Sequence, residues 1–303
     1  MSNKPKLSII IVSWNVRELL EKCLTSIEQH RGDLALEIIV VDNNSTDGSQ
    51  EMIANFKSQI ASLKTIFLNE NFGFAKGNNT GLEWAKGEYV LFLNPDTEVV
   101  GDALVKMARY MDTHPEVGAI GPKLLNTDGS LQRSVRAFPT LVSQLLILSK
   151  LHNFIPQFAP LKEYFRLDFD YELEQDVNQV MGAALLVRAS ILDEVGSFDA
   201  GYNKIFEEVD LCFRIKHAGH TIRYIPIARI IHHKGASFAQ SKILRKQLDF
   251  NQGMLRFFKK HKPAWQYVAL YLSQPISWLV TGLQVLLARI GDPVRKRFKR
   301  TEL

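Results

Sequence analysis

Cysteine is scarce in this sequence, and its two copies lie far apart. Cys23 and Cys212 form no CxxC motif and stand at no zinc-ligand spacing from a histidine, which argues against a disulfide framework and a structural zinc site. Reduced thiols in the cytoplasm are the simplest expectation. The N-terminus also lacks a long apolar run: residues 7–12 are too few for the core of a secretory signal peptide, and no small-residue cleavage site follows. We therefore expect no export by such a signal.

Glycine-rich phosphate-binding loops are missing as well. After the first apolar run the chain reads SWNVREL, which contains neither the GxGxxG of a dinucleotide-binding domain nor the GxxxxGK[ST] of a phosphate-loop enzyme. The glycine-rich, basic loop expected of a sugar nucleotidyltransferase is not there either. Three common classes of nucleotide-binding enzyme are thereby disfavoured.

Excess positive charge is confined to the C-terminal part of the chain. Residues 241–303 hold 13 Lys or Arg and 3 Asp or Glu, which leaves 24 basic and 29 acidic residues for positions 1–240. Anionic partners are therefore expected to bind at the C-terminal part. No nucleic acid partner is predicted.

A regular alternation of apolar runs and helical patterns occupies the first hundred residues. The runs lie near residues 7–13, 36–42, 64–68 and 89–93. Runs that are apolar on both faces, in strict strand–helix order, predict a parallel sheet covered on both sides. Ser45 or Thr46 is expected to cap the helix that starts near Gly48.

Polar residues gather where these predicted strands end. In such sheets ligands bind beyond the carboxyl ends of the strands. The polar residues at those ends are Ser13, Asn15, Asp42, Asn43, Asn69, Asn71, Asn94 and Asp96. Loop residues are often polar simply because they meet water. Four polar clusters in register favour a shared ligand crevice over that simpler explanation.

The fourth strand ends abruptly in the stretch YVLFLNPDTEV, residues 89–99. Pro95 cannot donate to a sheet ladder, so the strand must stop and leave Asp96 on a stiff turn. After residue 100 the order is less regular. Residues 138–176 contain three prolines and mix aromatic with charged residues, which predicts a long excursion from the α/β pattern.

Six stretches follow one another between residues 7 and 240: LSIIIVSWN, VVDNNSTDGS, NENFGFAKGNNTGLEWAKGEYVLFLNPDTEV, GAALLVRASILDEVGSFD, FEEVDLCFRIKHAGH and HHKGAS. Together they resemble glycosyltransferase family 2, particularly its rhamnosyltransferase-like branch. The resemblance implies a GT-A fold over residues 1–240, an α/β Rossmann-like domain with a mostly parallel central sheet. It also implies a nucleoside-diphosphate sugar donor, a divalent metal and transfer with inversion. Residues 241–303 would form a basic, amphipathic helical C-terminal region.

The resemblance assigns roles to two carboxylates at the strand ends. Asp96 is the implied ligand of Mg²⁺ or Mn²⁺, because most GT-A enzymes carry Asp-x-Asp where this branch and this chain carry Asn94-Pro95-Asp96. Asp42 matches the position that binds the nucleobase, where a carboxylate accepts the imide N–H of uracil or thymine. The alternatives are that Asp96 caps a following helix and that Asp42 bonds its own turn.

Further residues match the family's nucleotide loop and diphosphate region. Asn71, Gly73 and Asn79 match the loop that wraps the nucleotide, where Gly73 and Gly77 would let the backbone come close. His232 matches the histidine of the H-x-x-G-x-S element near the metal, although a lone histidine is more often structural. The predicted donor site is completed by the strand-end residues Ser13, Asn15 and Asn94.

By the same resemblance, the general base of inverting transfer belongs to the acidic pair in FEEVDLC. Glu208 stands where Asp is more usual and Glu207 precedes it, so either is a candidate to take the acceptor's proton. The alternative is that these acids only complement a helix dipole, which would also keep the base ionised at neutral pH. Asp210 is assigned a structural role, pairing with Arg214 one turn later.

Charged residues are absent from residues 263–288, yet polar residues recur there at helical spacing and Pro275 interrupts the middle. A membrane-spanning helix would be more uniformly apolar. We therefore predict a helix pair on an anionic membrane surface, aided by five basic residues in the following stretch PVRKRFKR. The alternative is a helical layer packed on the catalytic domain or in a homodimer.

The sequence thus predicts an inverting, metal-dependent glycosyltransferase, peripheral on the inner face of the cytoplasmic membrane. It would move a sugar such as rhamnose from a nucleoside-diphosphate sugar to a lipid-linked saccharide or cell-surface polysaccharide. The alternative is a non-catalytic nucleotide-sugar binding subunit or scaffold, which the unusual Glu208 keeps open.

Overall fold

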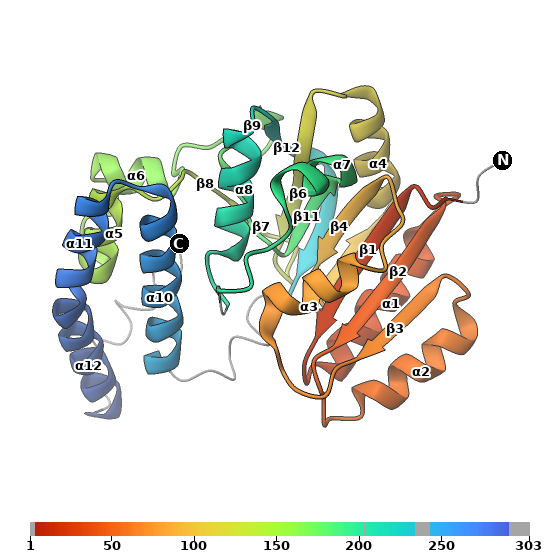
Figure 1. Ribbon diagram of the computed structural model, residues 1–303, viewed down its shortest axis with the longest axis horizontal. Helices are drawn as coiled ribbons and strands as arrows, with labels where there is room; N and C mark the ends of the chain where they lie inside the picture. The colour runs from red at the N-terminus through yellow and green to blue at the C-terminus, as the bar shows by residue number, and fades with distance from the viewer. Residues whose placement is uncertain (1–3, 203, 234–242, 291–303) are drawn as a thin grey trace.

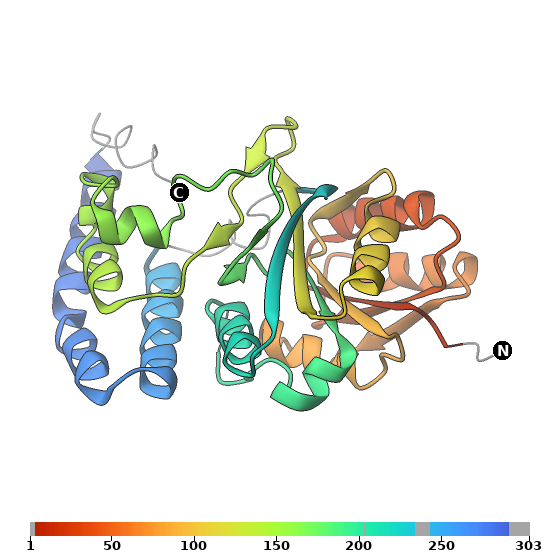
Figure 2. The same ribbon diagram turned by 90° about the horizontal axis from the view of Figure 1, so that it is seen from above.

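The computed structural model describes residues 4–202, 204–233 and 243–290. An α/β part and a helical layer lie side by side (Figure 1), with the helical layer at the end of the molecule opposite the N-terminus. The view from above shows the same separation (Figure 2).

The first four strands alternate with helices, as predicted. The elements are β1 (Leu7–Ser13), α1 (Arg17–His30), β2 (Leu36–Asp42), α2 (Ser49–Gln59), β3 (Leu63–Phe67), α3 (Gly73–Leu82) and β4 (Tyr89–Leu93). They pair in the order β3-β2-β1-β4, with every pair parallel. β1, β2 and β4 are buried along their whole length, because helices cover both faces of the sheet.

The remaining strands extend the same sheet. The elements are β5 (Thr97–Val100), α4 (Ala103–Thr113), β6 (Val117–Leu125), β11 (Ala184–Arg188), α7 (Ala189–Val195) and β12 (Thr221–His232). From β4 the order continues through β11, β6 and β12 to β5, with β11 and β5 antiparallel to their neighbours. Six of the eight strands therefore run in one direction, and the sheet is mostly parallel, as expected.

Four further strands are only two residues long each. They are β7 (Leu131–Gln132), β8 (Val135–Arg136), β9 (Gln175–Asp176) and β10 (Gln179–Val180). β7 pairs with β6 and β9 with β12, while β8 and β10 form a separate two-stranded sheet.

The glycines of α3 let this helix pack directly on β1. A β-carbon added at Gly77 would lie 2.7 Å from Val12 Cγ1, and one added at Gly81 would lie 2.6 Å from Ile10 Cγ2. Neither distance is tolerable for a real side chain, so only glycine allows this approach. The absence of a side chain at Gly77 therefore makes room for Val12 of β1. The sequence had indicated that it would let the backbone approach a nucleotide.

The predicted cap of α2 is wrong. Gly48, in the left-handed conformation with φ +83°, precedes the helix, and Asp47 Oδ1 accepts the N–H of the first helical residue at 3.1 Å. Ser45 and Thr46 instead join the loop after β1: Asn15 N donates to Ser45 Oγ at 2.9 Å, and Thr46 N donates to Asn15 Oδ1 at 2.7 Å. These residues therefore fasten two strand-end loops together.

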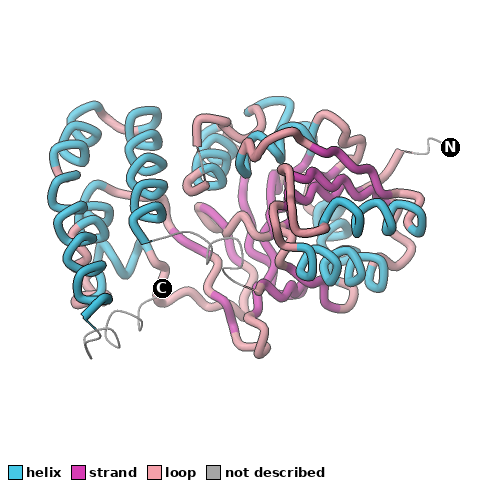
Figure 3. Tube along the Cα trace, turned by 90° about the horizontal axis from the view of Figure 1, so that it is seen from below, coloured by secondary structure: helices cyan, strands magenta, loops and turns pink. Residues whose placement is uncertain are grey.

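The helices of the excursion between residues 138 and 176 belong to the helical layer, whereas its end, β9, pairs with β12 of the sheet. Its helices are α5 (Leu141–Leu148), the 3₁₀ helix η1 (Leu151–Asn153) and α6 (Ala159–Tyr164), and they pack with α10 (Ile243–His261), α11 (Ala264–Leu272) and α12 (Gln274–Ile290). The tube view from below shows these helices grouped beside the sheet (Figure 3). Aromatic packing joins α10 to α8 (Glu207–His217). The predicted division at residue 240 falls within 234–242, outside the described residues.

The predicted helix pair α11–α12 is present, but its polar stripe faces the protein. Ser277 and Thr281 are fully buried, and Ser277 Oγ accepts from Gln247 Nε2 and Asn251 Nδ2 of α10, each at 3.2 Å. The large apolar side chains exposed on the pair are Trp265, Val268, Tyr271, Leu272, Ile276, Trp278, Leu279, Leu283 and Leu286. In the part of the chain that the structure describes, no helix combines the length and apolarity needed to cross a membrane.

Candidate active site

The carboxyl ends of β1 and β2 lie side by side. The sheet register pairs Ser13 with Asp42, and Asn43 N donates to the Ser13 carbonyl at 2.8 Å. The strand ends that the sequence predicted to share one edge of the sheet therefore do so.

Asp42 is buried, and one of its two carboxylate oxygens accepts hydrogen bonds from residues that follow it in the chain. Its Oδ1 accepts from Ser45 N at 2.9 Å and from Gln50 Nε2 at 3.0 Å, so the turn-forming alternative accounts for one oxygen. Among the described residues, Asp42 Oδ2, Asn43 Oδ1 and Ser13 Oγ have no hydrogen-bond partner although all three are buried. Buried polar atoms without partners are costly and rare, and three at one edge indicate a ligand site.

The loop before α3 closes over this edge. Asn71 Oδ1 accepts from Gly73 N at 2.9 Å, Gly73 has φ +85°, and the Gly73 carbonyl accepts from Asn43 Nδ2 at 3.2 Å. Asn79 faces another segment: its Nδ2 donates to the Phe198 carbonyl at 2.8 Å, and its Oδ1 accepts from Phe198 N at 3.1 Å. Both ends of the Asn79 amide are thus engaged in holding the loop before α8.

A tight turn presents Asp96 at the end of β4. Thr97 Oγ1 donates to the Asn94 carbonyl at 2.7 Å, and Asn94 N donates to the Ala183 carbonyl at 2.9 Å. A strand, not a helix, follows Asp96, which removes the helix-capping alternative. Because β5 pairs antiparallel with β12, Thr97 stands opposite His232 in the register.

Asp96 and His232 face one another in a buried position. His232 Nε2 lies 3.3 Å from Asp96 Oδ1, and His232 Nδ1 lies 2.7 Å from Gln132 Oε1. Gln132 Nε2 donates to Asn126 Oδ1 and to the His232 carbonyl, so Gln132 Oε1 must be the acceptor. The proton of a neutral His232 ring is therefore on Nδ1, and the Nε2 lone pair points at a carboxylate oxygen.

This pairing fits a divalent cation. Two acceptors that face each other across 3.3 Å repel unless a proton or a cation lies between them, and Asp96 Oδ1 has no hydrogen-bond partner among the described residues. No set of three or more His, Cys, Asp or Glu side chains within those residues is placed to hold a metal by itself. Mg²⁺ commonly binds one or two carboxylates and completes its shell with substrate phosphates and water, so two protein ligands suffice.

Glu208 lies beside the segment that holds the Asp96 turn. Its side chain packs against Gly182, where an added β-carbon would lie 3.3 Å from Glu208 Cβ and 3.8 Å from its carboxyl carbon. The next residue, Ala183, accepts the Asn94 N–H. Burial raises the pKa of Glu208, and the positive charge of Arg136 limits the rise. Burial thus opposes the stabilisation of the anion that the N-terminus of α8 provides.

Glu207 has a different environment from Glu208. It is buried, and its Oε2 lacks a hydrogen-bond partner among the described residues. Burial raises its pKa well above the usual value, and the negative charges of Glu208 and of Asp249 on α10 raise it further. The structure therefore places Glu208 against Gly182, next to the residue that contacts Asn94, and leaves Glu207 buried within reach of the charge on Asp249.

Comparison with known proteins identifies the family. Residues 8–169 match the family described as "Glycosyl transferase family 2". The chain belongs to this family. The N-acetylglucosaminyl-diphospho-decaprenol L-rhamnosyltransferase of Mycobacterium tuberculosis is 24% identical over 310 residues, covering 97% of this chain and 95% of the relative. The rhamnosyltransferase WbbL of Escherichia coli is 30% identical over 237 residues, covering 74% of this chain and 82% of the relative.

A solved structure supports the GT-A fold of this family 2 protein. The mannosyltransferase PcManGT from Pyrobaculum calidifontis, in complex with GDP-Man and Mn²⁺, superimposes with a TM-score of 0.58 at 17% identity, covering 96% of this chain and 77% of that chain. The resemblance to a rhamnosyltransferase-like branch is confirmed by the two relatives above.

Asp210 and His233, two polar residues near the candidate active site, form ion pairs within the protein. Asp210 pairs with Arg214 at 2.8 Å, as predicted, and also with Lys260 at 2.8 Å and His261 at 2.7 Å. Although burial alone would raise the pKa of Asp210, these partners, led by His261, hold it well below its usual range. His233 is engaged by Glu98 at 2.5 Å.

Three functional neighbours were missed by sequence reasoning. Gln132 orients His232, Gly182 receives Glu208, and Asp249 adds negative charge near Glu207. Gly182 opens the quoted stretch GAALLVRASILDEVGSFD, so its place before a buried strand was a usable signal. Gln132 and Asp249 carry no local signal, because their partners lie far away in the sequence.

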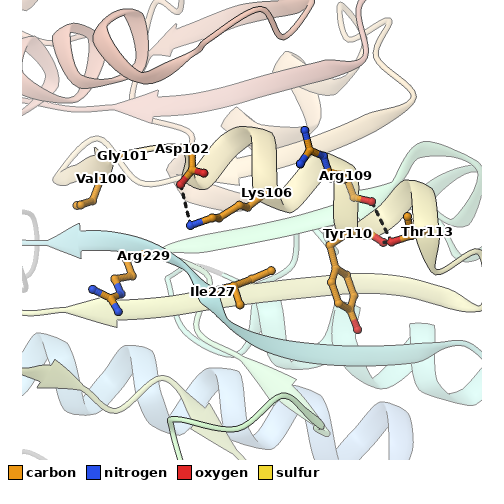
Figure 4. A pocket seen from close by; sticks show the side chains of 9 residues that line it. All are labelled: Val100, Gly101, Asp102, Lys106, Arg109, Tyr110, Thr113, Ile227 and Arg229. Carbon is orange, nitrogen blue, oxygen red and sulfur yellow. Dashed lines mark hydrogen bonds and ion pairs between the residues drawn. The ribbon is translucent and has the colours of Figure 1, made fainter.

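A surface hollow of ≈ 760 Å³ lies at the outer edge of the sheet. Its lining comes from β5, α4 and β12 (Figure 4), and it touches β5 at Val100, the end remote from Asp96. Lys106 in the lining is paired with Asp102 at 2.8 Å. No predicted site residue lines this hollow, so it is separate from the candidate active site.

Proposed function

We propose that the protein is an inverting, metal-dependent glycosyltransferase that uses a nucleoside-diphosphate sugar and a lipid-linked saccharide acceptor at the inner face of the cytoplasmic membrane. The observation that carries the proposal is the placement of Glu208 against Gly182, adjacent to Ala183, whose carbonyl accepts the N–H of Asn94 in the turn that presents Asp96. The proposed base and the turn of the proposed metal-binding carboxylate thus contact neighbouring residues of the segment that precedes β11.

The donor site follows from the unpartnered atoms at the sheet edge. Asp42 Oδ2 would accept the imide N–H of a uracil or thymine base, and Asn43 and Ser13 offer further polar atoms beside it. Asp96 and His232 would hold Mg²⁺ or Mn²⁺. When bound, such a cation neutralises charge that develops on the departing diphosphate.

The chemical step assigns one proton to Glu208. The acceptor hydroxyl attacks the anomeric carbon as the bond from that carbon to the diphosphate oxygen breaks. The electron pair of the broken bond leaves with the diphosphate, and the hydroxyl proton passes to the Glu208 carboxylate. Attack from the face opposite the diphosphate inverts the anomeric configuration.

The relatives support a choice of substrates. Both relatives described above are named as rhamnosyltransferases, and one of them is named for a decaprenol diphosphate acceptor. We propose rhamnose as the transferred sugar, dTDP-rhamnose as the first donor to test, and a polyprenol-linked saccharide or the polysaccharide built from it as the acceptor.

Donor binding tests this function. Titration calorimetry with a panel of nucleoside-diphosphate sugars and Mg²⁺ should show one that binds tightly and a weaker interaction with Asp42→Asn. The loss should be about tenfold or more, because a hydrogen bond to a charged group is worth roughly 1.5–3 kcal/mol. Asp33→Asn, an exposed aspartate, is the matched control and should bind as the wild type. If no member of the panel binds in the presence of metal, the proposal is wrong.

The outer face of α11–α12 supports association with a membrane surface. Amphipathic helices of soluble proteins bury their apolar side, whereas here Ser277 and Thr281 are buried while Leu272 and Leu279 are 70% and 66% exposed. An apolar outward face suits lipid, and the Arg- and Lys-rich residues 295–300 supply charge for anionic headgroups. We therefore propose that this pair lies in the headgroup region. A homodimer through the same face is the alternative.

Vesicle flotation tests the membrane face. The full chain should float with vesicles that contain phosphatidylglycerol, and a Leu272→Glu, Leu279→Glu double variant should remain mostly in the bottom fraction, since two charges enter an apolar surface. Leu173→Glu, another exposed leucine that lies outside this face, should float normally. Wild-type protein that does not float but doubles its mass in light scattering, in a manner lost in the double variant, would establish the homodimer instead.

A further inference from the structure

The residue before the acidic pair has an unusual backbone conformation. Phe206 has φ +80° and ψ −3° and immediately precedes α8. This left-handed region is unfavourable for a residue with a bulky side chain and persists only where its surroundings impose it. Phe206 is 2% exposed, so the surroundings that impose the conformation are packed protein.

Those surroundings come from α10. The Phe206 ring lies 5.6 Å from that of Phe250 and 5.9 Å from that of Phe257, both on α10. The two segments also touch at the backbone: a β-carbon added at Gly253 would lie 2.3 Å from the Ile205 carbonyl oxygen. Only a glycine at this position of α10 allows the chain before Glu207 to come so close.

Ion pairs also connect α10 to the N-terminal end of the segment that leads to α8. Asp199 pairs with Arg256 and with Lys260, each at 2.7 Å, and Lys260 also reaches Asp210 within α8 at 2.8 Å. The segment between α7 and α8 is therefore held at both sides of Phe206. On the opposite side, Asn79 of α3 holds Phe198.

We propose that α10 is a positioning element of the active site: by packing on Ile205 and Phe206 it imposes the left-handed turn that directs Glu208 toward Gly182. The C-terminal helices then do more than carry the protein to its acceptor. Relaxation of Phe206 to an ordinary backbone conformation would swing the first turn of α8, and Glu208 stands only two residues further on. This inference rests on the proposed role of Glu208 as the base.

Substitution at Gly253 tests the contact. Gly253→Ala should lower kcat by about tenfold or more, in line with the cost of displacing a catalytic group by a fraction of an ångström to 1 Å, while KM for the donor changes little. Gly282→Ala, in α12, is the matched control because its added methyl group meets no atom within 4 Å. Equal kcat values for both variants would overturn the proposal.

A pair of substitutions at Phe206 gives a readout that needs no substrate. Phe206→Gly and Phe206→Ala both remove the ring, but only glycine adopts φ +80° without strain. Hydrogen–deuterium exchange over residues 205–212 should therefore be slower in Phe206→Gly than in Phe206→Ala, and Phe206→Gly should retain the higher kcat. If Phe206 only fills space, Phe206→Ala should exchange as slowly as Phe206→Gly or more slowly, with an equal or higher kcat. That result would refute the inference. Faster exchange in Phe206→Ala with no transfer by the wild type would instead place the failure in the proposed function.

Discussion

Replacement of Glu208 by Gln is expected to reduce turnover by about 10²- to 10⁴-fold, the usual contribution of a positioned general base. The amide keeps the size of the side chain against Gly182 but cannot take the acceptor's proton. Donor affinity should stay near the wild-type value, because the strand ends proposed to bind the nucleotide are unchanged. Initial rates and donor titration on the same preparation measure both quantities.

The pH profile of the wild type provides a second test of this assignment. Burial raises the pKa of Glu208 and Arg136 partly offsets the rise, while the base acts only in its ionised form. kcat/KM should therefore increase with pH, with an inflection above the value of about 4.3 that an exposed glutamate shows. Glu207 is close enough to share this titration, so the inflection belongs to the pair.

Glu207→Gln is the matched control and should keep most of the turnover while gaining stability. The unfolded chain ionises glutamate near pH 4.3, about its reference value, whereas burial raises the pKa of Glu207 well above that in the folded protein. Between these two values the folded state holds the extra proton, so wild-type stability falls as pH rises through this window. The amide avoids that loss. Tm of Glu207→Gln should exceed that of the wild type at pH 7 and match it below about pH 4.

The opposite pattern would change the assignment. Loss of turnover in Glu207→Gln with an active Glu208→Gln would make Glu207 the base. Turnover that neither variant reduces would exclude both acids, and wild-type protein that binds a donor without transferring it would support the non-catalytic binding subunit.

The first half of the fold could be predicted because its signals are local. β1, β2 and β4 are apolar on both faces and end at polar residues, and the parallel register then brings Ser13 beside Asp42. The failures arise where a local rule competes with a distant contact. Ser45 is a good capping residue by type, but its hydroxyl accepts the N–H of Asn15 from another loop.

The second half of the site could not be derived from spacing. β5 begins directly after Asp96, yet its partner is β12, more than a hundred residues later, so His232 entered the prediction only through family resemblance. The same holds for the packing of α10, which lies in the C-terminal region that we expect to be helical and amphipathic. Its contact with Phe206 depends on a positive φ and on Gly253, neither of which a single sequence marks.

Asp96→Asn is expected to abolish metal-dependent turnover, with a loss of at least about 10²-fold, because a metal ion that neutralises a leaving diphosphate contributes several kcal/mol. Asparagine preserves the shape of the turn that Thr97 closes and removes the negative charge. With Asn94 in place of a second aspartate, no other carboxylate of the motif can compensate. Asp102→Asn is the matched control, since Asp102 is 64% exposed and pairs only at the surface with Lys106.

Binding of Mn²⁺, measured by electron paramagnetic resonance with the donor present, separates the metal site from catalysis. Asp96→Asn should leave Mn²⁺ free in solution, whereas Asp102→Asn should bind it as the wild type does. His232→Ala should weaken binding to a smaller extent, because it removes a neutral ligand and leaves the carboxylate charge in place. Gln132→Leu should have a similar but weaker effect, since it removes the acceptor that keeps the His232 proton on Nδ1. Unaltered Mn²⁺ affinity in Asp96→Asn would show that the single carboxylate after Pro95 is not the metal ligand. The buried Asp96–His232 pair would then be a structural ion pair between the turn before β5 and the end of β12.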